Sequence, residues 1–305
     1  MNRKSLRAAV AIATITLFIF CWKSDIIFTA KTDEEINLTI LCRLYHGSAL
    51  EYYNVFSVGY NIFWPKLWTS SDLVLVFDDE SEIDHRFAVT LANIPPYPKI
   101  KFEKKPSERT FCSDWRSEGY SRQQYSNFYS DVYTDKEFIG IVDTDSFFVT
   151  PVTPKDIFIE GKPRIIGYNG YTSWSESLQE IFDQKPIGEF MVVIGFPVVV
   201  RRKHFKMMRE FITRSLKVKT FEQAWFKICT KYSQKYSQFD IIAHYLWFHQ
   251  RDEYSWHFVD GNVAKHPAFA GRVTEEKNVL EKNEPIIGLM KHFAGKSISK
   301  PVYYY

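Results

Sequence analysis

The sequence lacks a strong charge of either sign. Its 39 Lys and Arg residues nearly balance its 36 Asp and Glu residues, which leaves a formal net charge of +3 over 305 residues. The basic residues are also scattered along the chain. Because binding to nucleic acid depends on clustered positive charge, the composition argues against nucleic-acid binding as the main task.

The chain also has no internal repeat, no low-complexity run and no linker long enough to separate two folded parts. With 45% apolar residues it has the composition of an ordinary globular protein that buries a sizeable core. Aromatic residues are plentiful, with 26 Phe, 18 Tyr and 8 Trp. Most of them belong in a core, although their faces also suit stacking on sugars or bases.

Cysteines are few, and none has the spacing of a metal site. Cys21 lies in the N-terminal apolar run, and the other three are Cys42, Cys112 and Cys229. Three cysteines in an oxidising compartment allow one disulfide and leave one thiol. The sequence does not choose among the pairings.

Only one apolar run has the length and flanks of a membrane-targeting segment, and it lies at the N-terminus. It extends from Ala8 to Trp22 and follows a basic segment that contains Arg3, Lys4 and Arg7. The run is shorter than the roughly 20 residues that cross an average bilayer, so it fits a signal peptide or a short anchor. Bulky residues stand where a signal peptidase prefers small ones, which favours an uncleaved anchor.

This organisation predicts a single-pass type II protein of the Golgi or endoplasmic reticulum membrane, because the positive flank stays cytosolic. We expect a cytosolic tail and signal-anchor helix over residues 1–24, a stem over 25–36, and a single lumenal domain over 37–305. Secretion after cleavage is the alternative. Asn37-Leu38-Thr39 is the only N-x-[ST] sequon, and whether Asn37 is glycosylated stays open, as does the oligomeric state.

Apolar segments typical of strands alternate with segments of helical character. The expected strands are at residues 36–45, 72–81, 98–104, 136–149, 162–170 and 188–202. The expected helices are at residues 81–93, 119–135, 203–217, 220–233 and 237–254. This alternation is typical of an α/β fold with a mixed, mostly parallel sheet flanked by helices.

The chemistry is concentrated where one strand ends. The stretch "EFIGIVDTDSFFVTP" runs from an apolar strand into Asp143 and Asp145. Carboxylates are rarely buried without a partner, and ligands of open α/β sheets collect beyond the carboxyl ends of the strands. Two aspartates at this spacing can bind one divalent cation, although a polar turn is the plainer alternative. Because phosphate oxygens commonly complete such a shell, a nucleoside diphosphate is the natural ligand.

Two stretches resemble motifs of the GT-A-fold, DxD-containing, nucleotide-sugar glycosyltransferases, in particular the glycogenin-like group of galactosyl- and glucosyl-transferases. "FIGIVDTDSFFVTPVTPKDIF" is similar to the strand that ends in the DxD motif, and "MKHFAGKSISKP" to the His-x-x-Gly...Lys-Pro ending. The resemblance implies a GT-A-like fold from about residue 37 to 301. It also implies Mn²⁺, or Mg²⁺, and a nucleoside-diphosphate sugar, with UDP as the expected nucleotide.

Carried over residue by residue, the resemblance implies that His292 joins Asp143 and Asp145 as a metal ligand. Gly295 would allow a close approach of the backbone to the diphosphate. Either Lys296 or Lys300 would contact the phosphates, because the lysine and proline follow the glycine at a longer spacing than in that group.

Three further residues are candidates at the site. Arg122 lies on the helix before the aspartates, where this fold often presents a basic residue to the donor. Asp240, in "QFDIIAH", is similar in place to an acidic residue near the transferred sugar in related enzymes. Asp78 ends the second strand, where it can lie near the nucleoside. The alternatives are an exposed helix charge for Arg122, a helix cap or ion pair for Asp240, and a solvated turn for Asp78.

The resemblance and the N-terminal anchor together predict a lumenal, metal-dependent hexosyltransferase that moves a sugar from the donor to a glycan, protein or lipid acceptor. Neither the donor sugar, the acceptor nor the stereochemical course can be read from the sequence. One alternative is a haloacid-dehalogenase-type phosphatase or phosphotransferase, whose Asp-x-Asp normally opens the domain and precedes a Gly-Thr pair. The other is a non-catalytic lumenal binding protein with the same fold.

Overall fold

The computed structural model describes residues 36–64, 72–107, 109–112, 117–144, 146–148, 151–169, 174–189, 197–233, 235–259 and 269–272. The chain divides into two units, Met1–Ile36 and Asn37–Tyr305, and every element below belongs to the second. The predicted anchor lies outside the described residues. Within the described stretches, no helix is long and apolar enough to cross a membrane.

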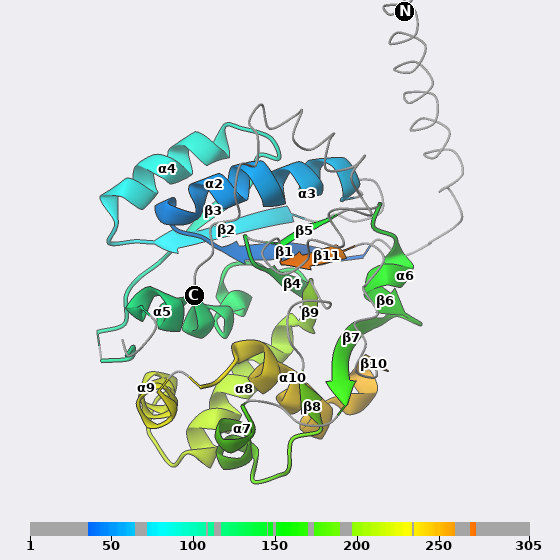
Figure 1. Cartoon of the computed structure of the whole chain (residues 1–305). Helices are drawn as coiled ribbons and strands as arrows, with labels where there is room; N and C mark the ends of the chain where they lie inside the picture. The colour runs from blue at the N-terminus through cyan, green and yellow to red at the C-terminus, as the bar shows by residue number, and fades with distance from the viewer. Residues whose placement is uncertain are drawn as a thin grey trace, which may run out of the picture. The chain divides into compact units, whose positions relative to one another are not determined.

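A five-stranded sheet in the order β3-β2-β1-β4-β9 forms the centre of the second unit (Figure 1). Four strands run parallel: β1 (Leu38–Arg43), β2 (Asp72–Asp78), β3 (Lys99–Glu103) and β4 (Phe138–Val142). The fifth, β9 (Val198–Arg201), is antiparallel to β4. Every residue of β1 and β4 is buried, as their apolar sequences predict for central strands that are covered on both faces. The predicted α/β class with a mixed, mostly parallel sheet is confirmed.

Helices cover both faces of this sheet. Figure 1 shows α2 (Ala49–Glu51), α3 (Ser57–Phe63) and α4 (Glu82–Ala92) along one face and α5 (Glu118–Asn127) along the other. A π-helical turn, Tyr52–Phe56, joins α2 to α3. Serine caps start the two longer helices: Ser81 Oγ accepts the N–H of Asp84 at 3.2 Å, and Ser117 Oγ accepts the N–H of Tyr120 at 3.3 Å.

The remaining strands form two small sheets. β10 (Ser255–Val259), β7 (Lys162–Asn169) and β6 (Phe158–Ile159) lie in that order, and β8 (Gly188–Glu189) also pairs with β7. β5 (Ser146–Phe148) pairs with β11 (Phe269–Arg272). The other helices are α6 (Pro154–Ile157), α7 (Ser175–Phe182), α8 (Arg202–Ser215), α9 (Phe221–Tyr232) and α10 (Gln238–His249), with short 3-10 turns at His46–Ser48, Ser130–Val132 and Arg251–Glu253.

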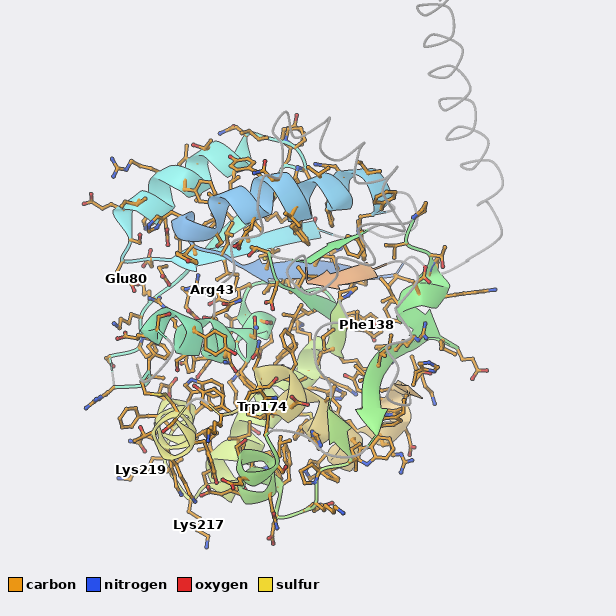
Figure 2. The ribbon with its side chains drawn as sticks, in the orientation of Figure 1. Arg43, Glu80, Phe138, Trp174, Lys217 and Lys219 are labelled. Carbon is orange, nitrogen blue, oxygen red and sulfur yellow. A yellow bond between two sulfur atoms is a disulfide. The ribbon has the colours of Figure 1, made fainter. Side chains whose placement is uncertain are left out.

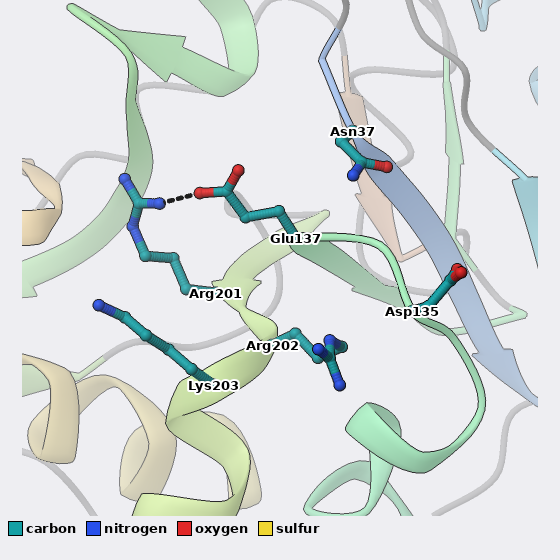
Figure 3. Close-up of a pocket in the computed structure, with 6 residues that line it drawn as sticks. All are labelled: Asn37, Asp135, Glu137, Arg201, Arg202 and Lys203. Carbon is teal, nitrogen blue, oxygen red and sulfur yellow. Dashed lines mark hydrogen bonds and ion pairs between the residues drawn. The ribbon is translucent and has the colours of Figure 1, made fainter.

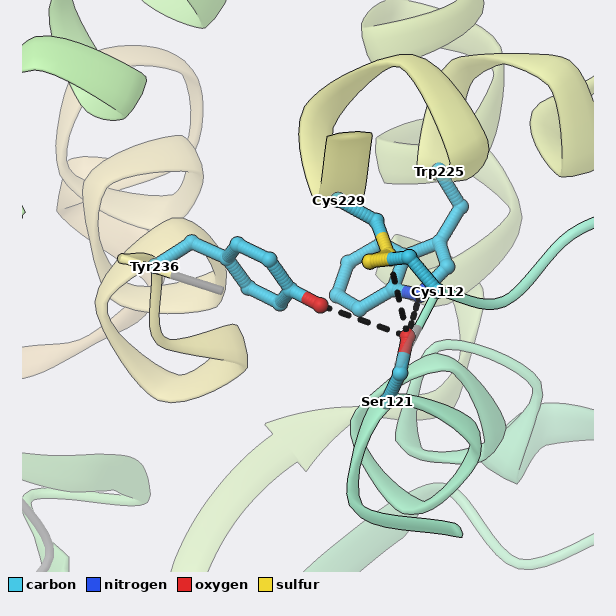
Figure 4. The surroundings of a disulfide bond; sticks show 5 residues. All are labelled: Cys112, Ser121, Trp225, Cys229 and Tyr236. Carbon is cyan, nitrogen blue, oxygen red and sulfur yellow. Dashed lines mark hydrogen bonds between the residues drawn. A yellow bond between two sulfur atoms is a disulfide. The ribbon is translucent and has the colours of Figure 1, made fainter. Parts of the chain in front are cut away.

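A disulfide between Cys112 and Cys229, with Cα atoms 6.0 Å apart, joins the segment before α5 to α9. Ser121 Oγ lies beside it, 3.5 Å from Cys229 Sγ, and accepts the indole N–H of Trp225 at 3.3 Å (Figure 4). Cys42 is a buried thiol in β1. The structure thereby selects one of the pairings that the sequence left open.

Most of the expected elements are present, but two expected strands are each divided. The strand expected over residues 136–149 contains β4 and β5, and the one expected over 188–202 contains β8 and β9; in both cases the two strands belong to different sheets. Other elements differ at their ends. The helix expected over residues 119–135 ends at Asn127 and gives way to the 3-10 turn at Ser130–Val132. Ser126 Oγ donates to the Arg122 carbonyl at 2.9 Å, and Ser130 Oγ donates to the Asn127 carbonyl at 2.8 Å. Such local hydrogen bonds from serine compete with a regular helical ladder.

Candidate functional site

Ionisable side chains mark the carboxyl edge of the central sheet. Glu103, Asp78 and Arg43 are the last residues of β3, β2 and β1, and Asp143 directly follows β4. Because these neighbouring strands are parallel, all four residues emerge at the same edge. Ligands of open α/β sheets bind at this edge, so the structure brings the predicted Asp143 and Asp78 to the expected side of the molecule.

The turn after β4 is held from both faces of the sheet. Gln123 Nε2, on α5, donates to Asp143 Oδ1 at 3.2 Å. On the other face, the Thr144 hydroxyl donates to Glu51 Oε2, at the end of α2, at 3.2 Å. Asp143 is 7% exposed. A carboxylate in a defined orientation is a suitable ligand for a hard divalent cation, and supporting hydrogen bonds of this kind fix the direction of such ligands.

The C-terminal part of the chain returns to this turn. β11 is antiparallel to β5, with Phe269 opposite Phe148 and Arg272 opposite Ser146, the residue after Asp145. Asp145 itself lies outside the described residues, and so do the residues of the predicted C-terminal motif: His292, Gly295, Lys296 and Lys300. Their roles stay predictions. The backbone register nevertheless brings the chain back to the Asp143–Asp145 turn shortly before that motif begins.

Arg122 lies in a cluster of ion pairs at the same edge. Its Nη1 is 2.9 Å from Asp78 Oδ1, its Nε is 3.4 Å from Glu103 Oε2, and it also pairs with Glu80. Arg43 pairs with Asp78, and its Nε lies 3.7 Å from Glu103 Oε2. Figure 2 marks Arg43 and Glu80 at this edge.

The electrostatics of this cluster favour charged side chains. Burial is the largest single effect and opposes the ionisation of Glu80. The hydrogen bond from Arg122, a backbone hydrogen bond and the charges of Arg122 and Lys105 together outweigh it and hold the pKa of Glu80 below its usual range. For Arg122, burial acts to lower the pKa, and the carboxylates of Glu80, Asp78 and Glu103 together raise it above its usual value. Arg122 is thus a charged, 5% exposed residue with carboxylate partners, and its predicted contact with a donor stays a prediction.

Asp240 is fully buried in the first turn of α10. Ser237 Oγ accepts its N–H at 3.3 Å, and its carbonyl lies 2.7 Å from His244 Nδ1. His244 Nε2 in turn lies 3.2 Å from the Ile187 nitrogen, so it accepts that N–H and Nδ1 carries the ring proton. Burial lowers the pKa of His244 to about 4, although its hydrogen bond to the Asp240 carbonyl opposes that effect.

The helix α5 connects Asp143 to the start of α10. Gln123 contacts Asp143, and the next residue, Gln124, accepts the N–H of Gln238 through Oε1 at 3.1 Å. Asp143 and the turn that carries Asp240 are therefore both positioned by adjacent residues of one helix. The role predicted for Asp240 stays a prediction.

The contacts of Gln123 and Glu51 with the turn after β4 are not predicted from the sequence. Gln123 is adjacent to the predicted Arg122, but a neutral amide on a polar helix gives no sequence signal of its own. Glu51 lies more than ninety residues before its partner Thr144, so only the fold brings them together. Among the described residues, no three His, Cys, Asp or Glu side chains form a group that could hold a metal ion. Two of the three predicted ligands lie outside that set.

No protein-family model and no curated protein matches the chain. Solved structures of glycosyltransferases are similar to it. Mouse xyloside xylosyltransferase 1, in its apo form, is 13% identical over 74% of this chain and 86% of its own, with a TM-score of 0.39. The galactosyltransferase LgtC, in complex with donor and acceptor sugar analogues, is 12% identical over 87% and 98%, with a TM-score of 0.44.

The mannosyltransferase Ktr4p from S. cerevisiae is 10% identical over 72% of this chain and 68% of its own, with a TM-score of 0.46. These are distant likenesses. All three are named as sugar transferases: a xylosyltransferase, a galactosyltransferase and a mannosyltransferase.

Proposed function

We propose that the chain is a GT-A-type glycosyltransferase that moves a sugar from a nucleoside-diphosphate donor to a glycan, protein or lipid acceptor. The place of Asp143 carries this proposal. It directly follows the central strand β4 at the carboxyl edge of the sheet, where ligands of open α/β sheets bind, and Gln123 Nε2 donates to its carboxylate at 3.2 Å. UDP is the expected nucleotide because of the resemblance of the two sequence motifs.

Asp143, at this edge, suits a divalent cation, Mn²⁺ or Mg²⁺. Asp143 supplies an oriented carboxylate, and Asp145 and His292 are the further ligands that the sequence motifs imply. When bound, such a cation would supply Lewis-acid assistance to the departing diphosphate. Gly295 would admit the diphosphate close to the backbone, and Lys296 or Lys300 would add positive charge at its oxygens. Asp240 is the residue that the resemblance assigns to the transferred sugar; in this structure it is fully buried in the first turn of α10.

The order of the strands favours this proposal over a haloacid-dehalogenase-type phosphatase. In that class the Asp-x-Asp pair normally opens the domain, whereas here it follows β4, the last of the four parallel strands along the chain. The first strand ends instead in Arg43, which is engaged in ion pairs with Asp78 and Glu103. An arginine in that pairing is no substitute for a nucleophilic carboxylate.

We propose further that this unit lies in the lumen of the Golgi or endoplasmic reticulum, attached through a type II anchor. The Cys112–Cys229 disulfide supports this location, because disulfides persist in oxidising compartments and are rare in the cytosol. The basic residues before the N-terminal apolar run support the orientation.

A thermal-shift experiment on residues 25–305 tests the donor site. We expect UDP together with Mn²⁺ to raise the midpoint, while UDP alone, GDP and CMP have little effect. A ligand at a hundredfold excess over its dissociation constant stabilises the folded state by about 2.7 kcal/mol. Asp143→Asn should abolish the shift. Asp135→Asn is the matched control, because Asp135 is exposed and lies before β4 at its opposite end.

Two results would overturn the proposal. One is the absence of a shift with every nucleotide and metal combination in a fragment whose circular dichroism shows that it is folded. The other is a shift that Asp143→Asn leaves unchanged, since the nucleotide would then bind elsewhere.

A further inference from the structure

Asn37 lies at the amino edge of the central sheet, directly before β1. Its carbonyl accepts the N–H of Phe138 at 3.0 Å, so the backbone is fixed by the neighbouring strand β4. The residue is nevertheless exposed, whereas all six residues of β1 are buried. Asn37 is therefore the last exposed residue before β1.

The third residue of the Asn37-Leu38-Thr39 sequon has the opposite environment. Thr39 is 0% exposed, and its Oγ1 lies 2.7 Å from Thr134 Oγ1. N-glycosylation requires the hydroxyl residue as well as the asparagine. Since the folded strand buries that hydroxyl, the sequon can be recognised only before β1 joins the sheet. Folding afterwards removes Thr39 from solvent and leaves Asn37 outside.

The structure has room for a sugar at this position. Asn37 lines a pocket of about 290 Å³ together with Asp135, Glu137, Arg201, Arg202 and Lys203 (Figure 3). Every lining side chain is polar, and Arg201 pairs with Glu137 across the pocket. A sugar attached to Asn37 would meet carboxylates, guanidinium groups and an ammonium group, which are hydrogen-bond partners for its hydroxyls.

We propose that Asn37 is an N-glycosylation site, modified on the nascent chain before β1 folds. Asn37 Nδ2 forms a bond to the anomeric carbon of an oligosaccharide carried on a lipid diphosphate. The bond from that carbon to the diphosphate breaks, the lipid diphosphate leaves, and the amide loses one proton. The inference rests on the lumenal location proposed above.

The glycan would not obstruct the proposed donor site. Leu38 is opposite Phe138 in the sheet, and Asp143 follows five residues beyond Phe138 along β4. At about 3.3 Å per residue, the two edges are separated by roughly 16 Å. Loss of the glycan should accordingly leave the metal-dependent nucleotide shift unchanged.

The experiment uses the full chain expressed in a cell with a secretory pathway, with electrophoretic mobility measured before and after treatment with an amide-cleaving glycosidase. The treatment should change the mobility of the wild-type protein by one step, which is the shift expected for the loss of a single glycan. Asn37→Gln and Thr39→Val should each abolish it, and Thr39→Ser, which keeps the hydroxyl, should retain it. If both variants lose the step, the loss cannot be explained by a folding defect in only one of them.

A control sequon separates this inference from the proposed location. Val132 is 61% exposed, and Val132→Asn places an asparagine two residues before Thr134. If Val132→Asn gains a step while wild type has none, the domain is lumenal and the assignment of Asn37 is wrong. If neither protein shows a step, the lumenal location fails and the assignment fails with it. A wild-type step that survives Asn37→Gln would also overturn the assignment.

Discussion

At the scale of single residues, a neutral side chain directs the carboxylate on which the proposed site depends. Gln123→Ala removes the donor to Asp143 Oδ1 while leaving an alanine that suits the helix α5. Supporting partners of metal ligands typically change metal affinity by about 10- to 100-fold. We expect a loss of that size in a titration of Mn²⁺ at fixed UDP, followed by thermal shift.

Gln179→Ala is the matched control for this variant, because Gln179 is exposed on α7 and its loss should leave the Mn²⁺ titration unchanged. An unaltered titration in Gln123→Ala would show that the hydrogen bond does not position a metal ligand. A weakened titration in both variants would indicate a general effect of the substitution.

The sequence predicts Asp143 but not Gln123, and the reason is physical. An apolar strand that ends in paired carboxylates has a recognisable local pattern, since charge at the end of a buried run needs a partner. The contact of Gln123 depends on how α5 is rotated against the sheet. That rotation places Arg122 among Glu80, Asp78 and Glu103, and its neighbour against Asp143.

At the scale of elements, the neutral imidazole of the buried His244 connects α10 to the chain before β8. Its Nε2 accepts the N–H of Ile187. The folded protein holds the pKa of His244 at about 4, against 6.5 in an unfolded chain. Below pH 6.5 the unfolded chain takes up a proton that the folded protein does not. Stability from this residue is therefore complete above pH 6.5 and falls as the pH decreases towards 4.

The thermal midpoint measured from pH 7 to pH 4 checks this expectation. We expect His244→Leu to be less stable than wild type at pH 7, because the Ile187 N–H loses its acceptor, but to lose less stability on acidification. His257→Gln, at an exposed histidine of β10, is the control variant. Equal acid sensitivity in wild type and His244→Leu would contradict the assignment of a buried neutral ring.

Among the three scales, the sequence predicts most about the helices and strands. Apolar runs predict β1, β2 and β4 because central strands of a parallel sheet are buried on both faces. The ends of elements depend on side-chain hydrogen bonds that composition does not reveal. Ser126 and Ser130 are one such case, since their bonds to the Arg122 and Asn127 carbonyls accompany the end of α5 before the predicted residue 135.

At the scale of the whole chain, the proposed donor site and the proposed glycosylation site lie at opposite edges of the parallel strands. The carboxyl edge carries Asp143, and the amino edge carries Asn37 with the polar pocket beside it. The pairing of β11 with β5 adds a long-range connection, because it brings the chain back beside Ser146 before the C-terminal motif. Local patterns in the sequence do not predict that pairing, since it joins segments more than a hundred residues apart.

This connection leads to a prediction for residues 285–305, which contain the C-terminal motif and lie beyond every helix and strand that the structure describes. A chain that ends at residue 284 retains the central sheet, the Cys112–Cys229 disulfide and β11. Circular dichroism and the thermal midpoint without ligand check that this shortened chain is folded. The shortened chain should lose the shift with UDP and Mn²⁺, because His292 and the lysines are the predicted partners of the metal and the diphosphate.

Point variants then show which residues of the deleted segment are responsible for the lost binding. His292→Ala should weaken binding of Mn²⁺, since it removes a ligand, and higher Mn²⁺ should recover part of the shift. Only one of Lys296→Ala and Lys300→Ala should weaken binding of UDP at saturating Mn²⁺, which would identify the lysine that contacts the diphosphate. A truncated chain that still shows the full shift would mean that residues up to 284 hold the metal and nucleotide without the C-terminal motif, and the resemblance of "MKHFAGKSISKP" would then have no functional meaning in this chain.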